Sequence, residues 1–238
     1  AVGYGALSGN TTGDNNVAVG ASSLNSNTTG ADNTAVGLSA AQTNTTGYHL
    51  VAIGRNALAG NTTGYQNVAV GRACMESNTT GPLNTAVGHH ALLINTSGSR
   101  NTAIGAFALD ANTTEGQNTA VGYQSLSSNT TGALNVAVGD EALFSNTTAS
   151  LNTAVGNDAL YANTTGTNCV AVGANALAGN TTGQANTAVG KNALDANTTA
   201  SNNTAIGHDC ATSNTTGYQH TAVGFEALRQ QNTGVRCT

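Results

Sequence analysis

The sequence has few charged residues, few aromatic residues, a single proline and no tryptophan. Charged residues make up 7% and aromatic residues 4% of the 238 residues, and the formal net charge is -5. An average globular domain carries about 25% charged residues, so the composition argues against ordinary globular domains. The six Lys and Arg residues are scattered and form no basic patch of the kind that binds nucleic acid. Disorder is disfavoured too, since disordered segments are usually rich in charge and proline.

The sequence also lacks a run of about 18 apolar residues, so no membrane span is expected. It shows no signal peptide. Neither end carries the atypical capping unit that closes a natural solenoid, apart from some decay of the pattern near Gln231. We therefore expect one uninterrupted domain over residues 1–238, which is either an excerpt from a longer fibre or a unit continued by neighbouring copies.

What the sequence has instead is a unit of 17 residues, repeated fourteen times without insertion or deletion. A strict period of this size is the signature of a solenoid. We number the positions of the unit from the alanine two residues before an invariant glycine. That glycine recurs as Gly3, Gly20, Gly37, Gly54, Gly71, Gly88, Gly105, Gly122, Gly139, Gly156, Gly173, Gly190, Gly207 and Gly224.

Most positions of the unit are restricted in residue type. Position 1 is always Ala, position 2 is Val or Ile, position 17 is Thr or Val, position 6 is small and position 7 is mostly Leu. Positions 10 to 13 read Asn-Thr-Thr-Gly with few exceptions, and position 16 is Asn in ten units. Of the seventeen Asp, Glu, Lys and Arg residues, sixteen occupy the variable positions 4, 5, 8, 14 and 15. These variable positions are therefore predicted to face water.

The pattern predicts an all-β fold, a parallel β-solenoid (β-roll) of fourteen 17-residue coils with two short strands in each coil. One strand would cover positions 16 to 2 and the other positions 6 to 9. The glycine at position 3 and the Asn-Thr-Thr-Gly corner would form the turns. Coils stacked as parallel strands lie about 4.8 Å apart, so the full set would make a rod roughly 65 to 70 Å long.

Alternation along the first strand places positions 17 and 2 on one face and positions 16, 1 and 3 on the other. Positions 17, 2 and 7 are expected to fill the core with Val, Ile, Leu and Thr. The alanine at position 1 never gives way to a charged or large residue, so its face is expected to pack against another chain. The predicted oligomer interface comprises Ala1, Ala18, Ala35, Ala52, Ala69, Ala86, Ala103, Ala120, Ala137, Ala154, Ala171, Ala188, Ala205 and Ala222.

The Asn-Thr-Thr corner matches the N-glycosylation pattern in thirteen units, and Asn202-Asn203-Thr204 adds one further match. The alternative is an asparagine ladder, in which identical side chains bond along the stack. We favour the ladder because glycans would be crowded at a spacing of about 4.8 Å. The asparagines concerned are Asn10, Asn27, Asn44, Asn61, Asn78, Asn95, Asn112, Asn129, Asn146, Asn163, Asn180, Asn197 and Asn214.

Stacked threonines at positions 11 and 12 are a further candidate surface, for ordered water as in ice-binding solenoids or for glycans. Adjacent residues of an extended segment face opposite sides, which weakens a two-rank threonine array. The four cysteines are expected to be free thiols, with an interchain bond left open, because pairs at the same position lie several coils apart. They are Cys74, Cys169, Cys210 and Cys237.

No catalytic residue, cofactor or metal ligand is predicted. His208-Asp209-Cys210 contains nucleophile-type residues in sequence, but catalytic groups must meet in space and neighbours in a strand or turn point apart. His89-His90 and the isolated His49 and His220 show no metal-ligand spacing. The chain is therefore not expected to be an enzyme.

The motif Asn-[Thr/Val]-Ala-[Val/Ile]-Gly, as in Asn67-Val68-Ala69-Val70-Gly71 and Asn118-Thr119-Ala120-Val121-Gly122, resembles the repeat of the YadA-like head of trimeric autotransporter adhesins. Related repeats occur in phage and algal-virus tail fibres. The resemblance covers all fourteen units and implies a left-handed parallel β-roll, three chains around an axis and a surface adhesin role. The head repeat of that family is shorter and lacks the Asn-Thr-Thr-Gly corner.

These observations predict a structural fibre or adhesin segment at a cell or virion surface, which spaces or presents a binding tip. One alternative is a self-assembling extracellular filament joined end to end, since open sheet edges template another chain. The other is an ice-binding or glycan-binding solenoid. The partners expected are further copies of the chain, as a trimer or filament, and a host-surface receptor or glycan, but not nucleic acid.

Overall fold

The computed structural model describes residues 1–230 and residue 234. The described residues are all-β, with one three-residue strand in each 17-residue coil and no helix, hence none that could cross a membrane. The chain divides into two compact units, residues 1–117 and residues 118–238. Unit 1 holds β1 (Val17–Val19), β2 (Thr34–Val36), β3 (Val51–Ile53), β4 (Val68–Val70), β5 (Thr85–Val87) and β6 (Thr102–Ile104). Unit 2 holds β7 (Thr119–Val121), β8 (Val136–Val138), β9 (Thr153–Val155), β10 (Val170–Val172), β11 (Thr187–Val189), β12 (Thr204–Ile206) and β13 (Thr221–Val223).

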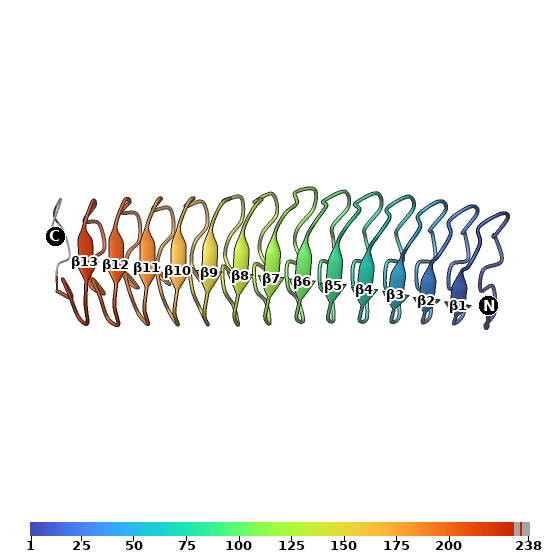
Figure 1. Cartoon of the computed structure of the whole chain (residues 1–238), viewed down its shortest axis with the longest axis horizontal. Coiled ribbons are helices and arrows are strands. Elements are labelled where there is room, and N and C mark those ends of the chain that lie inside the picture. The colour runs from blue at the N-terminus through green and yellow to red at the C-terminus, as the bar shows by residue number, and fades with distance from the viewer. Residues whose placement is uncertain (231–233, 235–238) are drawn as a thin grey trace. The chain divides into compact units, whose positions relative to one another are not determined.

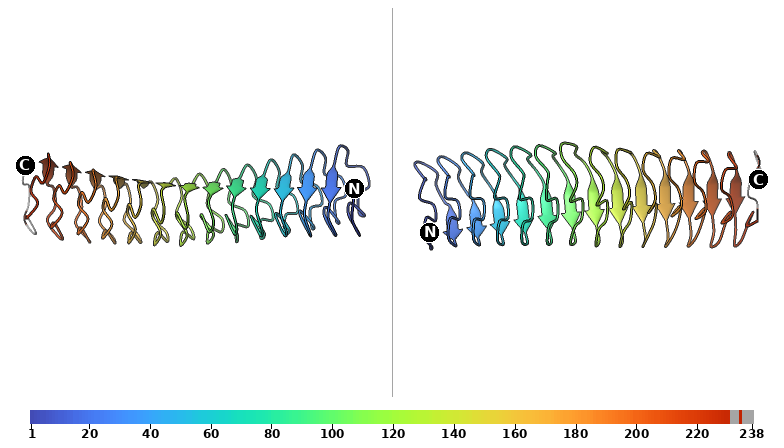
Figure 2. Two further views of the ribbon diagram at one scale, coloured as in Figure 1. Left: turned by 90° about the horizontal axis from the view of Figure 1, so that it is seen from below. Right: turned by 180° about the vertical axis from the view of Figure 1, so that it is seen from behind.

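Within each unit the strands stack in chain order as a parallel sheet (Figure 1). The register never shifts: Ala52 of β3 lies opposite Ala69 of β4, and Ala171 of β10 lies opposite Ala188 of β11. Figure 2 shows that the strands of each unit line one side of the coils, while the intervening chain closes each coil on the other side. The predicted parallel β-solenoid with a 17-residue coil is therefore confirmed.

The second predicted strand, at positions 6 to 9, does not form. Three successive turns replace it, as in the coil where Ala57 N donates to Gly54 O, Ala59 N to Asn56 O and Asn61 N to Leu58 O, at 3.2, 3.2 and 3.0 Å. Residues at positions 5 and 7 have positive φ, for example 60° at Asn56 and 53° at Leu58. This conformation is disfavoured for leucine. Complete burial of the Leu58 side chain, worth about 1.5–3 kcal/mol, offsets the cost.

The invariant glycine at position 3 is required by both conformation and space. Gly71 has a φ of 140°, and a Cβ there would clash with the carbonyl oxygen of Gly88 in the next coil. Any side chain at this corner would hold neighbouring coils apart. This requirement explains why position 3 is glycine in every unit.

The two faces of the strand are reversed relative to the prediction. The alanines at position 1 from Ala18 to Ala222 are at most 3% exposed and point into their own coil, where leucines such as Leu58 are also fully buried. Positions 17 and 2 point outward instead and are half-buried or exposed in every strand. The coil interior is narrow and already holds Leu and Asn side chains, so only a methyl group fits at position 1. The alanine ladder, Ala1 to Ala222, is thus a core feature and not an oligomer interface; Ala1 alone is exposed, in the first coil.

Candidate functional site

The asparagines at position 10 form ladders inside the coils. Asn61 is 0% exposed, and its Nδ2 donates to Oδ1 of Asn44 in the preceding coil at 2.8 Å and to Gly64 O in its own coil at 3.0 Å. The same pair of bonds recurs in unit 2, where Asn163 Nδ2 donates to Asn146 Oδ1 and to Gly166 O, both at 3.0 Å. Of the two readings of the Asn-Thr-Thr corner, the structure has the ladder. A glycan at an asparagine inside the ladder, such as Asn61, would have to replace a hydrogen of an Nδ2 that is buried and bonded to two acceptors.

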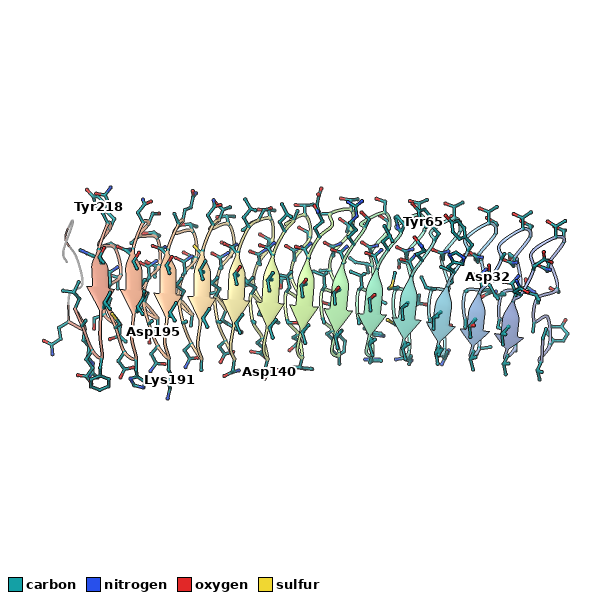
Figure 3. All side chains as sticks on the ribbon, viewed as in Figure 1. Asp32, Tyr65, Asp140, Lys191, Asp195 and Tyr218 are labelled. Atoms are coloured by element: carbon teal, nitrogen blue, oxygen red, sulfur yellow. The ribbon has the colours of Figure 1, made fainter. Side chains whose placement is uncertain are left out.

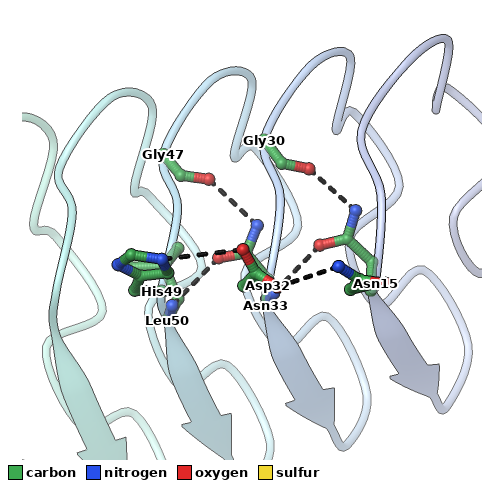
Figure 4. Close-up of polar contacts among 8 residues, drawn as sticks. Asn15, Gly30, Asp32, Asn33, Gly47, His49 and Leu50 are labelled. Atoms are coloured by element: carbon green, nitrogen blue, oxygen red, sulfur yellow. Dashed lines mark hydrogen bonds and ion pairs between the residues drawn. The ribbon is translucent and has the colours of Figure 1, made fainter.

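A second asparagine ladder occupies position 16, where the sequence predicted an outer face. Asn33 is 1% exposed, and its Nδ2 donates to Gly47 O of the next coil at 2.9 Å. Its Oδ1 accepts from the main-chain nitrogen of Leu50 at 3.0 Å (Figure 4). Each amide therefore ties two coils together. Where Cys169 takes this position, its Sγ donates to Gly183 O at 3.4 Å and keeps one of the two links.

The outward side chains at positions 17 and 2 of the strands in each unit form what we call the strand face. In unit 1 it includes Ile53, Val87 and Ile104, which are 40%, 37% and 40% exposed. In unit 2 it includes Val172 and Ile206, 37% and 41% exposed. Position 17 is only Thr or Val and position 2 only Val or Ile in all fourteen units. The outer positions 4, 5, 8, 14 and 15 vary freely, and position 12, the other restricted exposed position, carries the hydroxyl group of Thr or Ser. The strand face is therefore the restricted outer surface that carries the aliphatic side chains of Val and Ile.

Among the described residues, the charged side chains other than Glu115 lie at the variable positions on the outside of the coils, as predicted. In Figure 3, Asp140 and Lys191 of unit 2 project from one edge of the coils, and Tyr218 projects from the opposite edge. In unit 1 the carboxylate of Asp32 accepts from Asn15 Nδ2 at 3.2 Å and lies 3.6 Å from His49 Nε2 (Figure 4). These exposed contacts run along the stack from coil to coil and contribute little to stability.

Threonines at position 11 use their hydroxyl hydrogens within the stack. Thr62 Oγ1 donates to Thr79 O of the next coil at 3.0 Å, and Thr79 Oγ1 donates to Thr96 O at 3.0 Å. Position 12 residues such as Thr63 and Thr80 are exposed. The two threonine ranks therefore face different environments, as expected from their adjacency in the chain.

The three described cysteines are free and buried, as predicted, and Cys237 lies outside the described residues. Burial raises the pKa of the Cys74 thiol to about 12. Burial also raises the pKa of Cys169 and of Cys210. Thiolate formation is disfavoured at all three positions because each thiol is removed from water.

His208, Asp209 and Cys210 do not converge. Nδ1 of His208 lies 3.3 Å from the Asp209 carboxylate, whereas Cys210 Sγ points into the coil and donates to Ala222 O at 3.3 Å. His89 and His90 stack with ring centroids 3.8 Å apart, and His89 Nε2 contacts the Arg72 guanidinium at 2.9 Å. Within the described part of the chain, no group of three or more His, Cys, Asp or Glu side chains is arranged to hold a metal ion.

No protein-family model matches this sequence, and neither curated proteins nor solved structures gave a match.

Proposed function

We propose that the chain is a structural segment of an extracellular fibre at a cell or virion surface, which spaces or presents a binding tip. The observation that carries this proposal is the repeated docking of one coil onto the next. The same bonds recur without a register shift: main-chain bonds such as Val51 N to Asn67 O at 3.0 Å, and the amide ladder through Asn44 and Asn61 at 2.8 Å. A coil of this kind lengthens by adding identical units, which is what a spacer requires.

Duplication of one whole unit tests the spacer role. A chain in which residues 52–68 are repeated once in tandem should fold, retain its β-sheet circular dichroism and resist denaturant at least as well as the parent. Each added unit supplies one more coil-to-coil interface, and solenoid stability is approximately the sum of such terms. A matched control inserts the first sixteen residues of the same unit, which breaks the register of every ladder. The spacer proposal fails if the whole-unit insertion unfolds the protein as severely as the control.

We also propose that copies of the chain associate through the strand face, as a trimer or a larger assembly. Ile53, Val87 and Ile104 give unit 1 an apolar face with no charged residue at positions 17 and 2. Flat sheet faces pack about 10 Å apart with interdigitating side chains, and two copies with the same period keep their side chains in step. An end-to-end filament is the second arrangement, since an open edge of a parallel sheet templates another strand.

Sedimentation velocity separates these arrangements. A single discrete oligomer supports side-by-side association, and a broad, concentration-dependent series supports the filament. A stable monomer across the accessible concentration range would contradict both arrangements. The spacer role has its own test in the duplicated chain.

A further inference from the structure

A hollow in unit 2 lies apart from the strand face and the ladders. Its volume is about 240 Å³, and it is lined by Glu141, Asp158, Tyr161, Asn175 and Ala178. All five residues are half-buried, so their side chains contribute to a surface that is neither core nor fully exposed. The hollow combines an aromatic ring, two carboxylates and a carboxamide.

The turn of the coil explains why these residues meet. Glu141, Asp158 and Asn175 occupy position 5 of three successive coils, whereas Tyr161 and Ala178 occupy position 8. Positions 5 and 8 are joined by a tight turn, in which Tyr161 N donates to Asp158 O and Ala178 N to Asn175 O, both at 3.3 Å. Position 5 therefore supplies a row of polar side chains along the stack, the polar rank. It runs beside the row of side chains at position 8, the aromatic rank, which includes Phe144 and Tyr161.

The aromatic rank ends at the hollow. Phe144 and Tyr161 occupy position 8 of neighbouring coils, and their rings are stacked with centroids 5.3 Å apart and planes 6° from parallel. The next residue in this rank is Ala178, whose methyl group does not extend the stack. Tyr161 and Ala178 both line the hollow, and Phe144 does not. The ring face of Tyr161 that is turned away from Phe144 is therefore available to a ligand above Ala178.

The polar rank determines which ligands fit. Ionised Glu141 and Asp158 only accept hydrogen bonds, whereas the Asn175 amide both donates and accepts. Asn175 Nδ2 donates to Asn192 Oδ1 at 3.3 Å, which leaves its own Oδ1 and its second N–H hydrogen for a ligand. Two carboxylates in one hollow repel anions, so phosphorylated or carboxylated ligands are disfavoured.

We infer that this hollow binds one sugar ring of a neutral or amine-bearing glycan. A pyranose has an apolar face of C–H groups that can lie on the Tyr161 ring, and its hydroxyl groups donate to the two carboxylates and bond the Asn175 amide. A volume of about 240 Å³ lies below the usual range for drug-sized ligands, about 300 to 1,000 Å³, and suits a single ring. An amino group on that ring adds attraction to Glu141 and Asp158. This inference is independent of self-association through the strand face.

Ligand-observed saturation-transfer NMR with three tetrasaccharides tests the inference. The probes are cellotetraose, which is neutral, a glucosamine tetramer, which is cationic, and tetragalacturonate, which is anionic. The neutral and cationic probes should bind saturably, with a dissociation constant on the order of 1 mM for one ring in a shallow site. The anionic probe should bind at least about tenfold more weakly. Absence of saturable binding by the first two probes, or equal binding of the anionic probe, would overturn the inference.

Three variants locate the binding. Tyr161→Ala removes the stacking surface, and alanine is already native at this position in Ala178; affinity should fall at least about tenfold. Ala178→Tyr continues the aromatic stack into the hollow and should abolish binding. The matched control, Ala59→Tyr, makes the same substitution at position 8 in unit 1 and should leave binding unchanged. If the Tyr161→Ala and Ala178→Tyr variants bind as well as the parent, the hollow is not the site.

Discussion

The side-chain amide of Asn78 donates to Oδ1 of Asn61 in the preceding coil at 2.8 Å, with both residues fully buried. The second hydrogen of the same Nδ2 bonds Gly81 O at 3.0 Å, and Asn78 Oδ1 accepts from Asn95 Nδ2 at 2.8 Å. Each asparagine therefore satisfies its neighbours on both sides. Removal of the Asn78 amide takes one hydrogen-bond partner from each of three groups, which are Asn61 Oδ1, Gly81 O and Asn95 Nδ2.

We expect Asn78→Ala to lower the free energy of unfolding by about 2–5 kcal/mol. Each buried polar group left unsatisfied costs about 1–3 kcal/mol, and Gly81 O keeps its second donor, Asn67 Nδ2, at 2.8 Å. Guanidinium denaturation followed by circular dichroism measures the change. Ser77→Ala, one residue earlier at a half-buried position, is the control and should shift the midpoint little. Equal midpoints for the two variants would show that the ladder is not a major source of stability.

Two glycines in unit 2 should differ in their tolerance of alanine. Gly156 has a φ of 139°, and a Cβ there would lie 2.6 Å from the main-chain carbon of Gly173. Gly156→Ala should therefore destabilise by several kcal/mol, about the cost of strain together with overpacking. Gly166→Ala is the control. A Cβ there would also crowd Gly183 O and Asn163 Oδ1. However, Gly166 does not have a positive φ, and Ala149 and Ala200 show that the coil accommodates alanine at this position. In thermal unfolding, the Gly166→Ala variant should have a much higher melting temperature than the Gly156→Ala variant. The reverse order would contradict the geometry of the position 3 corner.

Alkaline pH should weaken the fold through the buried thiols. The pKa of Cys74 rises from 9.0 to about 12 on folding, so its contribution to stability is complete below pH 9 and is lost as the pH rises from 9 towards about 12. In that window the Cys74 thiol lowers the free energy of unfolding by about 1.4 kcal/mol per pH unit. Denaturation curves between pH 8 and pH 11 measure the effect. The Cys74→Ala variant should show a shallower decline, and an identical decline would exclude this thiol as a cause.

Expression in a glycosylating host should separate the two kinds of acceptor sequence. Asn202 is exposed and heads Asn202-Asn203-Thr204. The position 10 asparagines from Asn27 to Asn214 are fully buried in the ladder, and Asn10 in the first coil is half-buried. Glycosylation that respects the folded coil should therefore spare Asn27 to Asn214 and leave Asn202 and Asn10 as the accessible acceptors. In a chain that carries Asn10→Gln, intact-mass measurement should show one glycan or none, and adding Asn202→Gln should return the bare mass. Several glycans that persist in Asn202→Gln would mean that the ladder does not form in that host.

Much of the fold could be predicted because the period, the position 3 glycine and the β-branched strand residues all indicate stacked coils. Alternation correctly grouped positions 17 and 2 against positions 16, 1 and 3, but alternation alone does not say which group faces inward. Side-chain size favours Val, Ile and Thr for the core, but the interior already holds Leu58 and the Asn61 amide and accepts only a methyl group at Ala52. The invariance of alanine over fourteen units was the available signal, and it reflects tight packing within the chain.

The turn at positions 4 to 9 and the hollow could not be predicted from sequence pattern. Leucine rarely adopts positive φ, so nothing in the sequence indicates that Leu58 does so at 53°. That turn brings position 5 beside position 8 and so places Asp158 near Tyr161. Without it, the two residues belong to a variable surface with no recognisable motif.

The most direct test of the account is whether charge on the strand face disperses an assembly. In sedimentation velocity, the parent chain should form a discrete oligomer, and Val70→Lys combined with Val87→Lys should shift it to monomer, since each substitution places an unpaired charge in the interface. Thr63→Lys combined with Thr80→Lys adds the same charge at exposed position 12 and should leave the oligomer intact. A parent chain that is monomeric, or a strand-face variant that sediments like the parent, would contradict association through this face.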